Sequence, residues 1–215
     1  MIKITIYARL DLGMNKINYQ RILDDTINKL AAEGRRPRLL LHACCAPCSS
    51  YTIEYLSKYF DITLYFYNPN ISPESEYDFR ADELVRLTEE MSLGVNIPVE
   101  VEKHNSAEFY NAIVGMEDQP EGGSRCRVCY RLRLEKSAEY AKENGFDYFT
   151  TTLSISPYKN SAWLNEIGTE LAQNYGVEYL ISDFKKKNGY KRSCELSEKY
   201  GLYRQNYCGC EFSKR

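Results

Sequence analysis

The chain of 215 residues lacks the features of a membrane or secreted protein. Its first ten residues, Met1 to Leu10, contain no apolar core of signal-peptide length, and no stretch approaches the roughly 20 apolar residues of a membrane-spanning helix. We therefore expect a cytoplasmic protein without membrane contact. Because that compartment keeps thiols reduced, the eight cysteines predict metal binding or redox catalysis rather than a structural disulfide framework.

The chain also has no large excess of charge of either sign and few histidines. The net charge of −2 gives no global basic character, and the two histidines, His42 and His104, are expected to be core or surface residues rather than ligands. From residue 185 to 215, nine Lys or Arg stand against three Asp or Glu, so this segment carries +6 and the rest of the chain −8. A basic C-terminal segment on an acidic body predicts one face for an anionic partner.

Strand-like and helix-like segments alternate along the chain, with no internal repeat or low-complexity tract. Apolar and β-branched runs predict strands at 39–43, 62–67, 96–101, 147–150 and 177–181. Helical spacing predicts helices at 18–33, 49–58, 73–94, 107–116, 130–144 and 162–175, with a loop at 117–124. This alternation predicts an α/β fold with a doubly wound, mostly parallel sheet. We expect a single domain over residues 18–215, with residues 1–17 as an N-terminal extension of no assigned role.

Six of the eight cysteines fall in three short clusters, and Cys194 stands apart as an ordinary small apolar residue. The clusters are Cys44-Cys45 with Cys48, Cys126-x-x-Cys129, and Cys208-x-Cys210. The first directly follows a predicted strand, at the carboxyl end where open α/β sheets place their ligand crevice. The second is expected at a loop-to-helix junction before Tyr130, where a helix N-terminus supports thiolate charge. Metal-site loops are therefore predicted at the carboxyl edge of the sheet.

The spacing of the first two clusters favours an iron–sulfur cluster over zinc. A structural zinc site usually pairs two Cys-x2-4-Cys knuckles, whereas Cys44 and Cys45 are adjacent. In an iron–sulfur cluster each thiolate meets its own iron, so more varied spacing is tolerated. Zinc and free thiols stay open as alternatives.

The third cluster, Cys208-Gly209-Cys210, predicts a redox couple. A disulfide between these cysteines would close a very small ring, and its strained geometry would make it readily reduced. The alternative is that both cysteines are further metal ligands.

Two polar segments are candidates for substrate binding. The first follows a strand at the same edge of the sheet, and the second interleaves cations with aromatic rings as single-stranded nucleic acid binding requires. The candidate residues are Thr152, Ser156 and Lys159 in the first segment, and Lys185, Lys186, Lys187, Tyr190 and Arg204 in the second. The alternatives are a capped loop for the first and a solvated charged face for the second.

Four motifs in this order resemble the QueH family of epoxyqueuosine reductases, over about residues 38 to 213. They are His42-Ala43-Cys44-Cys45-Ala46-Pro47-Cys48, Arg125-Cys126-x-x-Cys129-Tyr130-x-x-Arg133-Leu134, Thr150-Thr151-Thr152-Leu153 with Ser156-Pro157-Tyr158-Lys159, and Tyr203-Arg204-Gln205-x-Tyr207-Cys208-Gly209-Cys210-x-Phe212-Ser213. The resemblance implies a Rossmann-like, nucleotide-hydrolase-like fold. It also implies a cobalamin-independent enzyme that reduces epoxyqueuosine to queuosine at the tRNA wobble position, the last step of queuosine biosynthesis.

The same resemblance implies roles for the cysteines. Cys44, Cys45, Cys126 and Cys129 would hold a 4Fe-4S cluster, and Cys208 and Cys210 would form the redox-active pair. Cys48 is the candidate ligand of an additional iron ion beside the cluster. The implied partners are tRNA carrying epoxyqueuosine in its anticodon and an electron donor that the sequence does not identify.

Two other functions compete with this interpretation. An ATP-dependent tRNA thiolase needs a Gly-rich phosphate loop after the first strand, but cysteines occupy that position and Gly122-Gly123-Ser124 lies far along the chain. A zinc-stabilised RNA-binding module without catalysis would be colourless and carry stoichiometric zinc. Visible absorbance of anaerobically purified protein distinguishes this module from an iron–sulfur enzyme.

Overall fold

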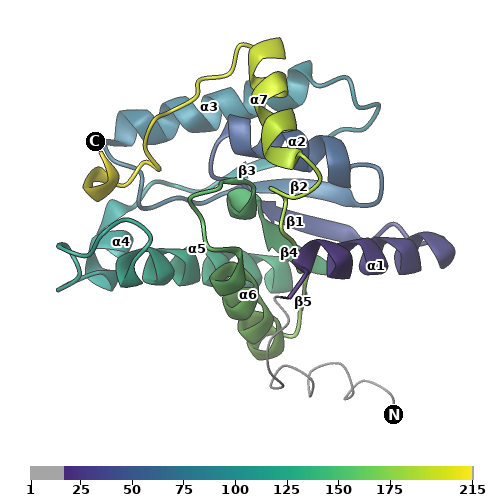
Figure 1. Cartoon of the computed structure of the whole chain (residues 1–215), viewed down its shortest axis with the longest axis horizontal. Helices are drawn as coiled ribbons and strands as arrows, with labels where there is room; N and C mark the ends of the chain where they lie inside the picture. Colours follow the sequence, from purple (N-terminus) through teal and green to yellow (C-terminus); the bar gives the residue numbers. More distant parts are fainter. Residues whose placement is uncertain (1–16, 215) are drawn as a thin grey trace.

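The computed structural model describes residues 17–214, and a parallel sheet forms the centre of this part of the chain (Figure 1). The strands are β1 (Arg38–His42), β2 (Asp61–Phe66), β3 (Val99–Val101), β4 (Tyr148–Thr151) and β5 (Glu178–Tyr179). Their spatial order is β3-β2-β1-β4-β5, so strand addition reverses direction between β1 and β4. The predicted α/β fold with a doubly wound parallel sheet is confirmed. The predicted extension at residues 1–17 lies, except for its last residue, outside the described residues.

Helices cover both faces of the sheet (Figure 1). The α-helices are α1 (Tyr19–Ala32), α2 (Ala46–Leu56), α3 (Glu74–Glu90), α4 (Ser106–Ala112), α5 (Ser124–Glu143), α6 (Ser161–Tyr175) and α7 (Gly189–Lys199), with 3-10 turns η2 (Thr152–Ile155) and η3 (Glu211–Ser213). Helices α1, α2 and α3 pack on one face, and α5 and α6 on the other. In the described part of the chain, every helix is too short or too polar to cross a bilayer.

Strand β1 supplies the middle of both apolar layers. Successive side chains of a strand point to opposite faces, so Leu39 and Leu41 pack toward α1, α2 and α3, while Leu40 packs toward α5 and α6 with Phe149 of β4. All four side chains are fully buried. A strand buried on both faces is a continuous apolar run, which explains why the sequence predicts β1 so well.

Helix α2 begins at Ala46, three residues before the predicted start. Cys45 is its N-cap residue, and Pro47 occupies the first turn, where a missing N–H leaves no helical hydrogen bond unmade. Ser49 lies inside the helix, and its hydroxyl donates to the carbonyl oxygen of Cys45 at 2.8 Å. The earlier start places Cys48 in the first turn of α2.

Helix α5 begins at Ser124, six residues before the predicted start. The prediction that Cys126 and Cys129 occupy a loop-to-helix junction is therefore wrong, since both lie within the first two turns. Cys126, Cys129 and Arg133 recur at intervals of three and four residues, which places them on one face of the helix. This three- and four-residue spacing is the signal in the sequence that indicates a helix at these cysteines.

Helix α7 was not predicted, because the sequence opens it with a glycine and gives it few apolar residues. The structure explains that glycine. A Cβ atom at Gly189 would lie 2.0 Å from the carbonyl oxygen of Phe184 and 2.4 Å from Cε1 of Tyr51 on α2. Only glycine therefore lets α7 pack this closely against α2.

Candidate active site

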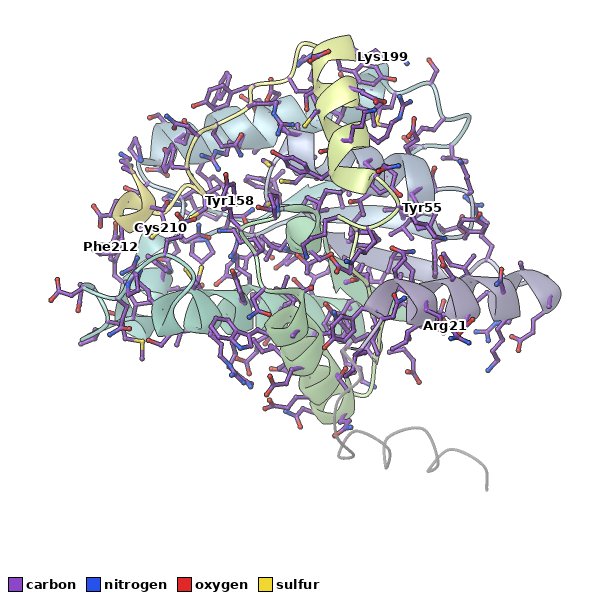
Figure 2. All side chains as sticks on the ribbon, in the orientation of Figure 1. Arg21, Tyr55, Tyr158, Lys199, Cys210 and Phe212 are labelled. Carbon is purple, nitrogen blue, oxygen red and sulfur yellow. The ribbon has the colours of Figure 1, made fainter. Side chains whose placement is uncertain are left out.

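A cavity of about 350 Å³ lies beyond the carboxyl ends of the central strands and brings two of the cysteine clusters together. Four cysteines and four cations lie in its wall, together with several tyrosines and one carboxylate. These lining residues are Cys44, Cys45, Cys48, Cys208, Arg80, Arg133, Lys159, Arg204, Tyr158, Tyr190, Tyr207 and Glu121. Figure 2 labels Tyr158 left of the centre of this view, with Cys210 and Phe212 further toward its left side. Thiols and cations thus share one concave surface, a setting suited to redox chemistry on an anionic or polar substrate.

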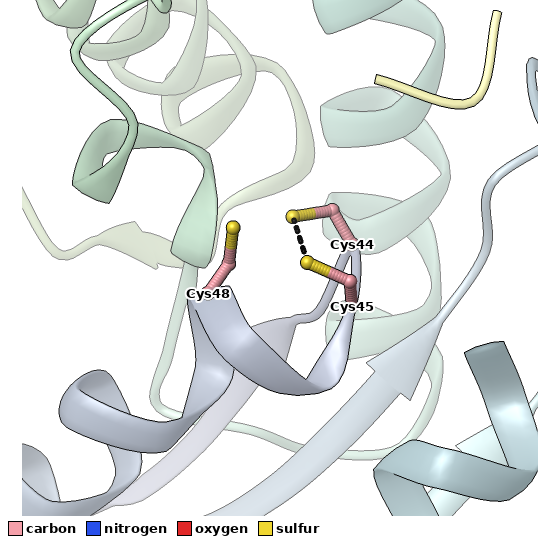
Figure 3. A group of neighbouring side chains, drawn as sticks. All are labelled: Cys44, Cys45 and Cys48. Atoms are coloured by element: carbon pink, nitrogen blue, oxygen red, sulfur yellow. Dashed lines mark hydrogen bonds between the residues drawn. The ribbon is translucent and has the colours of Figure 1, made fainter. Parts of the chain in front are cut away.

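The first cluster places three sulfur atoms around the N-terminal turn of α2 (Figure 3). The sulfur atoms of Cys44 and Cys45 are 3.8 Å apart, and all three sulfur atoms, with that of Cys48, lie within 4.8 Å of one another. Two thiolates bound to one tetrahedral ion at about 2.3 Å stand roughly 3.8 Å apart. The three cysteines can therefore bind a metal. Over residues 17–214, no other group of three His, Cys, Asp or Glu residues is this compact.

Mutual hydrogen bonding makes the three thiols unequal. Side-chain contacts with the thiols of Cys45 and then Cys48 lower the pKa of Cys44 well below its ordinary value. The same contacts raise the pKa of Cys45 to about 12 and raise that of Cys48 as well. The hydroxyl of Thr152 lies 3.5 Å from the sulfur of Cys44, and it accepts a hydrogen bond from the backbone N–H of Cys44 at 3.3 Å. These contacts therefore favour the thiolate of Cys44 over the thiolates of Cys45 and Cys48, and a thiolate is the form that binds a soft cation.

His42 is the last residue of β1 and does not join this group. Its ring lies within hydrogen-bonding distance of the carbonyl oxygen of Tyr67 through Nε2 and of the hydroxyl of Thr151 through Nδ1. Since a carbonyl can only accept, Nε2 carries the proton and Nδ1 accepts. Burial, followed by the charge of Arg133, lowers the pKa of His42 to about 4. As predicted from the sequence, this histidine is a core residue.

The second cluster, Cys126 and Cys129, lies on one face of α5 and outside the lining of the cavity. Cys126 is half-buried, and its sulfur accepts from the backbone N–H of Gly122 at 3.2 Å. It packs against the same apolar cluster as Cys44. Cys129 is buried beside Cys210 in a smaller apolar cluster, and burial raises the pKa of its thiol. The two α5 cysteines thus lie between the first and third clusters, but outside the compact group formed by the first.

The third cluster lies in the C-terminal segment of the chain. After α7 this segment runs back to α4 and the start of α5 (Figure 1). Both cysteines are free thiols. Cys208 lines the cavity, whereas Cys210 is buried beside Cys129. Gly209 has φ +102, and a Cβ atom there would lie 2.7 Å from Cγ1 of Ile71, so only glycine fits this turn.

The surroundings of Cys208 favour its thiolate. The Cys210 thiol, Lys159 and the Ser213 hydroxyl lower the pKa of Cys208 well below its ordinary value, in that order of effect, and Ser213 Oγ is 3.1 Å from the Cys208 sulfur. The same contact with Cys208 raises the pKa of Cys210. Although burial disfavours its ammonium, the neighbouring Cys208 raises the pKa of Lys159. Of the two thiols, Cys208 is therefore the one whose surroundings favour the thiolate, and it also lines the cavity.

The structure divides the candidate substrate-binding residues between two cavities. Ser156, Lys159, Tyr190 and Arg204 line the cavity that contains the cysteines, and Thr152 lies against Cys44. Lys185, Lys186 and Lys187 instead line a second cavity of about 870 Å³, which shares Lys159 with the first. Two of the three are paired: Lys185 with Asp183 and Lys187 with Asp24, both at 2.7 Å.

Sequence reasoning missed two buried arginines of the cavity wall, Arg80 and Arg133. Arg80 is 2 % exposed, pairs with Glu76 at 2.7 Å and donates to the carbonyl oxygen of Cys208 at 3.3 Å. Its guanidinium also lies over the ring of Tyr207. A cation on the apolar face of a predicted amphipathic helix was the available signal for Arg80, and the four-residue spacing from Cys129 was the signal for Arg133.

Comparisons with known proteins all match one enzyme family. The family model of epoxyqueuosine reductase QueH matches residues 39–215. The chain is similar to a protein named epoxyqueuosine reductase QueH in Streptococcus pyogenes serotype M1, with 45 % identity over 93 % of this chain and 79 % of the relative. It is also similar to relatives of the same name in Staphylococcus epidermidis, with 44 % identity over 92 % and 85 % of the two chains, and in Thermotoga maritima, with 38 % identity over 81 % and 89 %.

Proposed function

Because the chain belongs to the epoxyqueuosine reductase QueH family, we propose that it reduces epoxyqueuosine to queuosine at the wobble position of tRNA, the last step of queuosine biosynthesis. One structural observation supports the proposal independently of the family assignment. Cysteines from distant parts of the chain, Cys44 and Cys208 among them, meet cations and tyrosines around one cavity. This arrangement supports a reductase of a polar nucleic acid substrate over an ATP-dependent thiolase or a non-catalytic zinc module.

The stoichiometry of the reaction determines how many electrons and protons the cysteines must supply. Removing the epoxide oxygen as water and leaving an alkene takes two electrons and two protons. Oxidation of the Cys208 and Cys210 thiols to a disulfide releases two electrons and two protons, so this pair balances one turnover. The position of Cys208 in the cavity wall supports its role as the thiol nearer the substrate, with Cys210 as its buried partner. An external electron donor then returns the disulfide to the dithiol.

The proposed ligands of a 4Fe-4S cluster are Cys44, Cys45, Cys126 and Cys129. Thiolates are the donors that such clusters take, and a bound cluster supplies one-electron transfer. Two observations support this set: Cys44 and Cys126 pack against the same apolar cluster, and the charge of Arg133 lies close to both Cys44 and Cys129. An anionic centre fits such surroundings.

Cys48 is the proposed ligand of an additional iron ion. Its sulfur lies within 4.8 Å of the sulfur atoms of Cys44 and Cys45, so it can bind an ion beside a cluster held by those two cysteines.

An anaerobic assay tests the proposed activity. The protein is incubated with epoxyqueuosine-containing tRNA and dithionite, and the nucleosides are then analysed by mass spectrometry. We expect epoxyqueuosine to lose one oxygen and become queuosine, with no change when either protein or dithionite is omitted. Unchanged epoxyqueuosine in the presence of iron-loaded protein would contradict the proposal.

The tRNA is proposed to bind across both cavities, with its modified base near Tyr190 and Arg204 and its phosphates near the lysines of the second cavity. The guanidinium of Arg204 lies 5.8 Å from the ring centre of Tyr190, and arginine planes and aromatic rings are the groups on which unstacked RNA bases stack. Lys159 lines both cavities, so the two share one cation.

Replacing Lys185, Lys186 and Lys187 together by alanine should weaken tRNA binding and flatten its salt dependence. Three unpaired lysines on phosphates of a single-stranded anticodon loop would contribute roughly 2.1 to the slope of log K against log salt. Two of these lysines are already paired with aspartates, so we expect the slope to fall by roughly one to two. Filter binding at several salt concentrations measures this slope.

A control triple variant, Lys29→Ala with Lys136→Ala and Lys142→Ala, makes the same change in net charge away from both cavities. It should leave the slope nearly unchanged. Equal slopes for the wild-type protein and the variant at 185–187 would identify those lysines as a solvated face.

A further inference from the structure

Glu121 is the only acidic side chain in the wall that residues 17–214 form around the cavity with the cysteines. This side chain is 27 % exposed, and its Oε1 lies 3.6 Å from Nζ of Lys159. The three other cations of the wall are arginines, Arg80, Arg133 and Arg204. Glu121 is therefore the one carboxylate that can meet a cationic group of a ligand in a wall otherwise rich in positive charge.

The loop that carries Glu121 is held in place on both sides of this residue. Before it, the guanidinium of Arg125, which is only 2 % exposed, donates to three backbone carbonyl oxygens within residues 116–119. After it, the N–H of Gly123 donates to the carbonyl oxygen of Pro120 at 3.0 Å. A fixed backbone limits where the carboxylate can lie, which is what a binding residue on a loop requires.

The proposed substrate carries one cationic group close to its reacting atoms. In epoxyqueuosine a secondary amine joins the methylene group on the 7-deazaguanine ring to the cyclopentane ring, at the carbon next to the epoxide. A secondary alkylamine is protonated at neutral pH, as the amine of lysine is. A base bound with its epoxide beside Cys208 therefore brings an ammonium group into the cavity in whose wall Glu121 also lies.

We propose that Glu121 binds the secondary ammonium group of the modified base and thereby selects wobble bases with a cationic substituent over neutral ones. The inference rests on the proposed function. Hydrogen bonds between an ammonium group and a carboxylate are stronger than those between neutral groups. A carboxylate has about four acceptor sites, so Glu121 can bind the ammonium group while it remains beside Lys159.

The binding of two tRNAs tests this recognition without any reduction. The tRNAs differ only in the wobble base: one carries 7-aminomethyl-7-deazaguanine, whose amine is protonated, and the other carries 7-cyano-7-deazaguanine, whose nitrile is neutral. Neither base contains an epoxide, and the phosphate contacts are the same, so the ratio of the two dissociation constants reports the charge. We expect the full-length protein to bind the aminomethyl tRNA about tenfold more tightly, the scale of one charge-assisted hydrogen bond.

Glu121→Gln keeps the size of the side chain and removes its charge. The preference for the aminomethyl tRNA should then fall to within about twofold. Asp118→Asn is the matched control, because it removes the same charge from the same loop, at an exposed residue that lines neither of the two cavities. This control should keep the preference of the wild-type protein.

Equal affinity of the wild-type protein for the two tRNAs would overturn the inference, and this measurement decides even if Glu121→Gln does not fold, which far-UV circular dichroism establishes. An unchanged preference in Glu121→Gln would also overturn it. That is the result expected if Glu121 only holds Lys159 in place, since both tRNAs would then bind more weakly by the same factor.

The reductase assay gives a separate result. Reduction of epoxyqueuosine by a protein without the binding preference would contradict this inference alone. The binding preference in an iron-loaded protein that leaves epoxyqueuosine unchanged would contradict the proposed activity and support the recognition of the ammonium group.

Discussion

Cys208→Ser should retain the metal content of the wild-type protein and lose turnover by roughly three orders of magnitude, as expected when a reacting group is removed. Serine keeps a hydrogen-bonding partner for the hydroxyl of Ser213, which lies 3.1 Å from the Cys208 sulfur, but it cannot form a disulfide. Of the proposed redox pair, Cys208 is the thiol that lines the cavity, so its loss removes the proposed reacting group from the cavity wall. Iron analysis and the anaerobic tRNA assay with dithionite measure the two effects on the same preparation.

Cys194→Ser is the control for Cys208→Ser. Cys194 is a half-buried free cysteine on α7, and it lines neither of the two cavities described above. The control should keep both its metal and its activity. Normal turnover by Cys208→Ser would refute the dithiol role, and loss of iron by Cys208→Ser would favour the alternative that this cysteine is a metal ligand.

Cys45→Ser and Cys126→Ser should each lose the iron and acid-labile sulfide of the cluster, and with them turnover. The two positions test the proposed ligands on two different helices, because Cys45 is the N-cap residue of α2 and Cys126 lies in the first turn of α5. Serine is a hard oxygen donor of similar size, so it changes the ligand while leaving the packing nearly unchanged. Iron and sulfide analysis of anaerobically purified protein, together with its visible absorbance, gives the result.

Cys48→Ser separates the two proposed metals. Cys48 shares the compact sulfur group with Cys44 and Cys45 but is not among the proposed cluster ligands. We expect this variant to lose the additional iron and to keep the sulfide, so that the ratio of iron to sulfide falls. Unchanged iron in Cys126→Ser would remove the α5 cysteines from the ligand set, and loss of sulfide in Cys48→Ser would add Cys48 to it.

The parallel sheet could be predicted because its signals are local. Leu39, Leu40 and Leu41 form an apolar run between a proline and the first cysteines, and such a run is what burial on both faces requires. The starts of helices were less accessible. Helix α5 extends six residues further than predicted because its first turns are covered by α4 and the C-terminal segment, contacts that no local pattern encodes. Helix α7 depends on a close approach to α2 at Gly189, which also lies far away in the sequence.

The amino-acid sequence by itself determined the chemistry of this protein: soft thiol donors in three clusters, the first of them at the end of a buried strand, within motifs that identify the family. The tertiary structure decided where each sulfur lies. It turned Cys208 into the cavity and buried Cys210, and it brought Cys44, Cys208 and Arg133 into the wall of the same cavity. The physical reason is that exposure and charge compensation depend on neighbours supplied by other elements, and these neighbours exist only once the chain has folded.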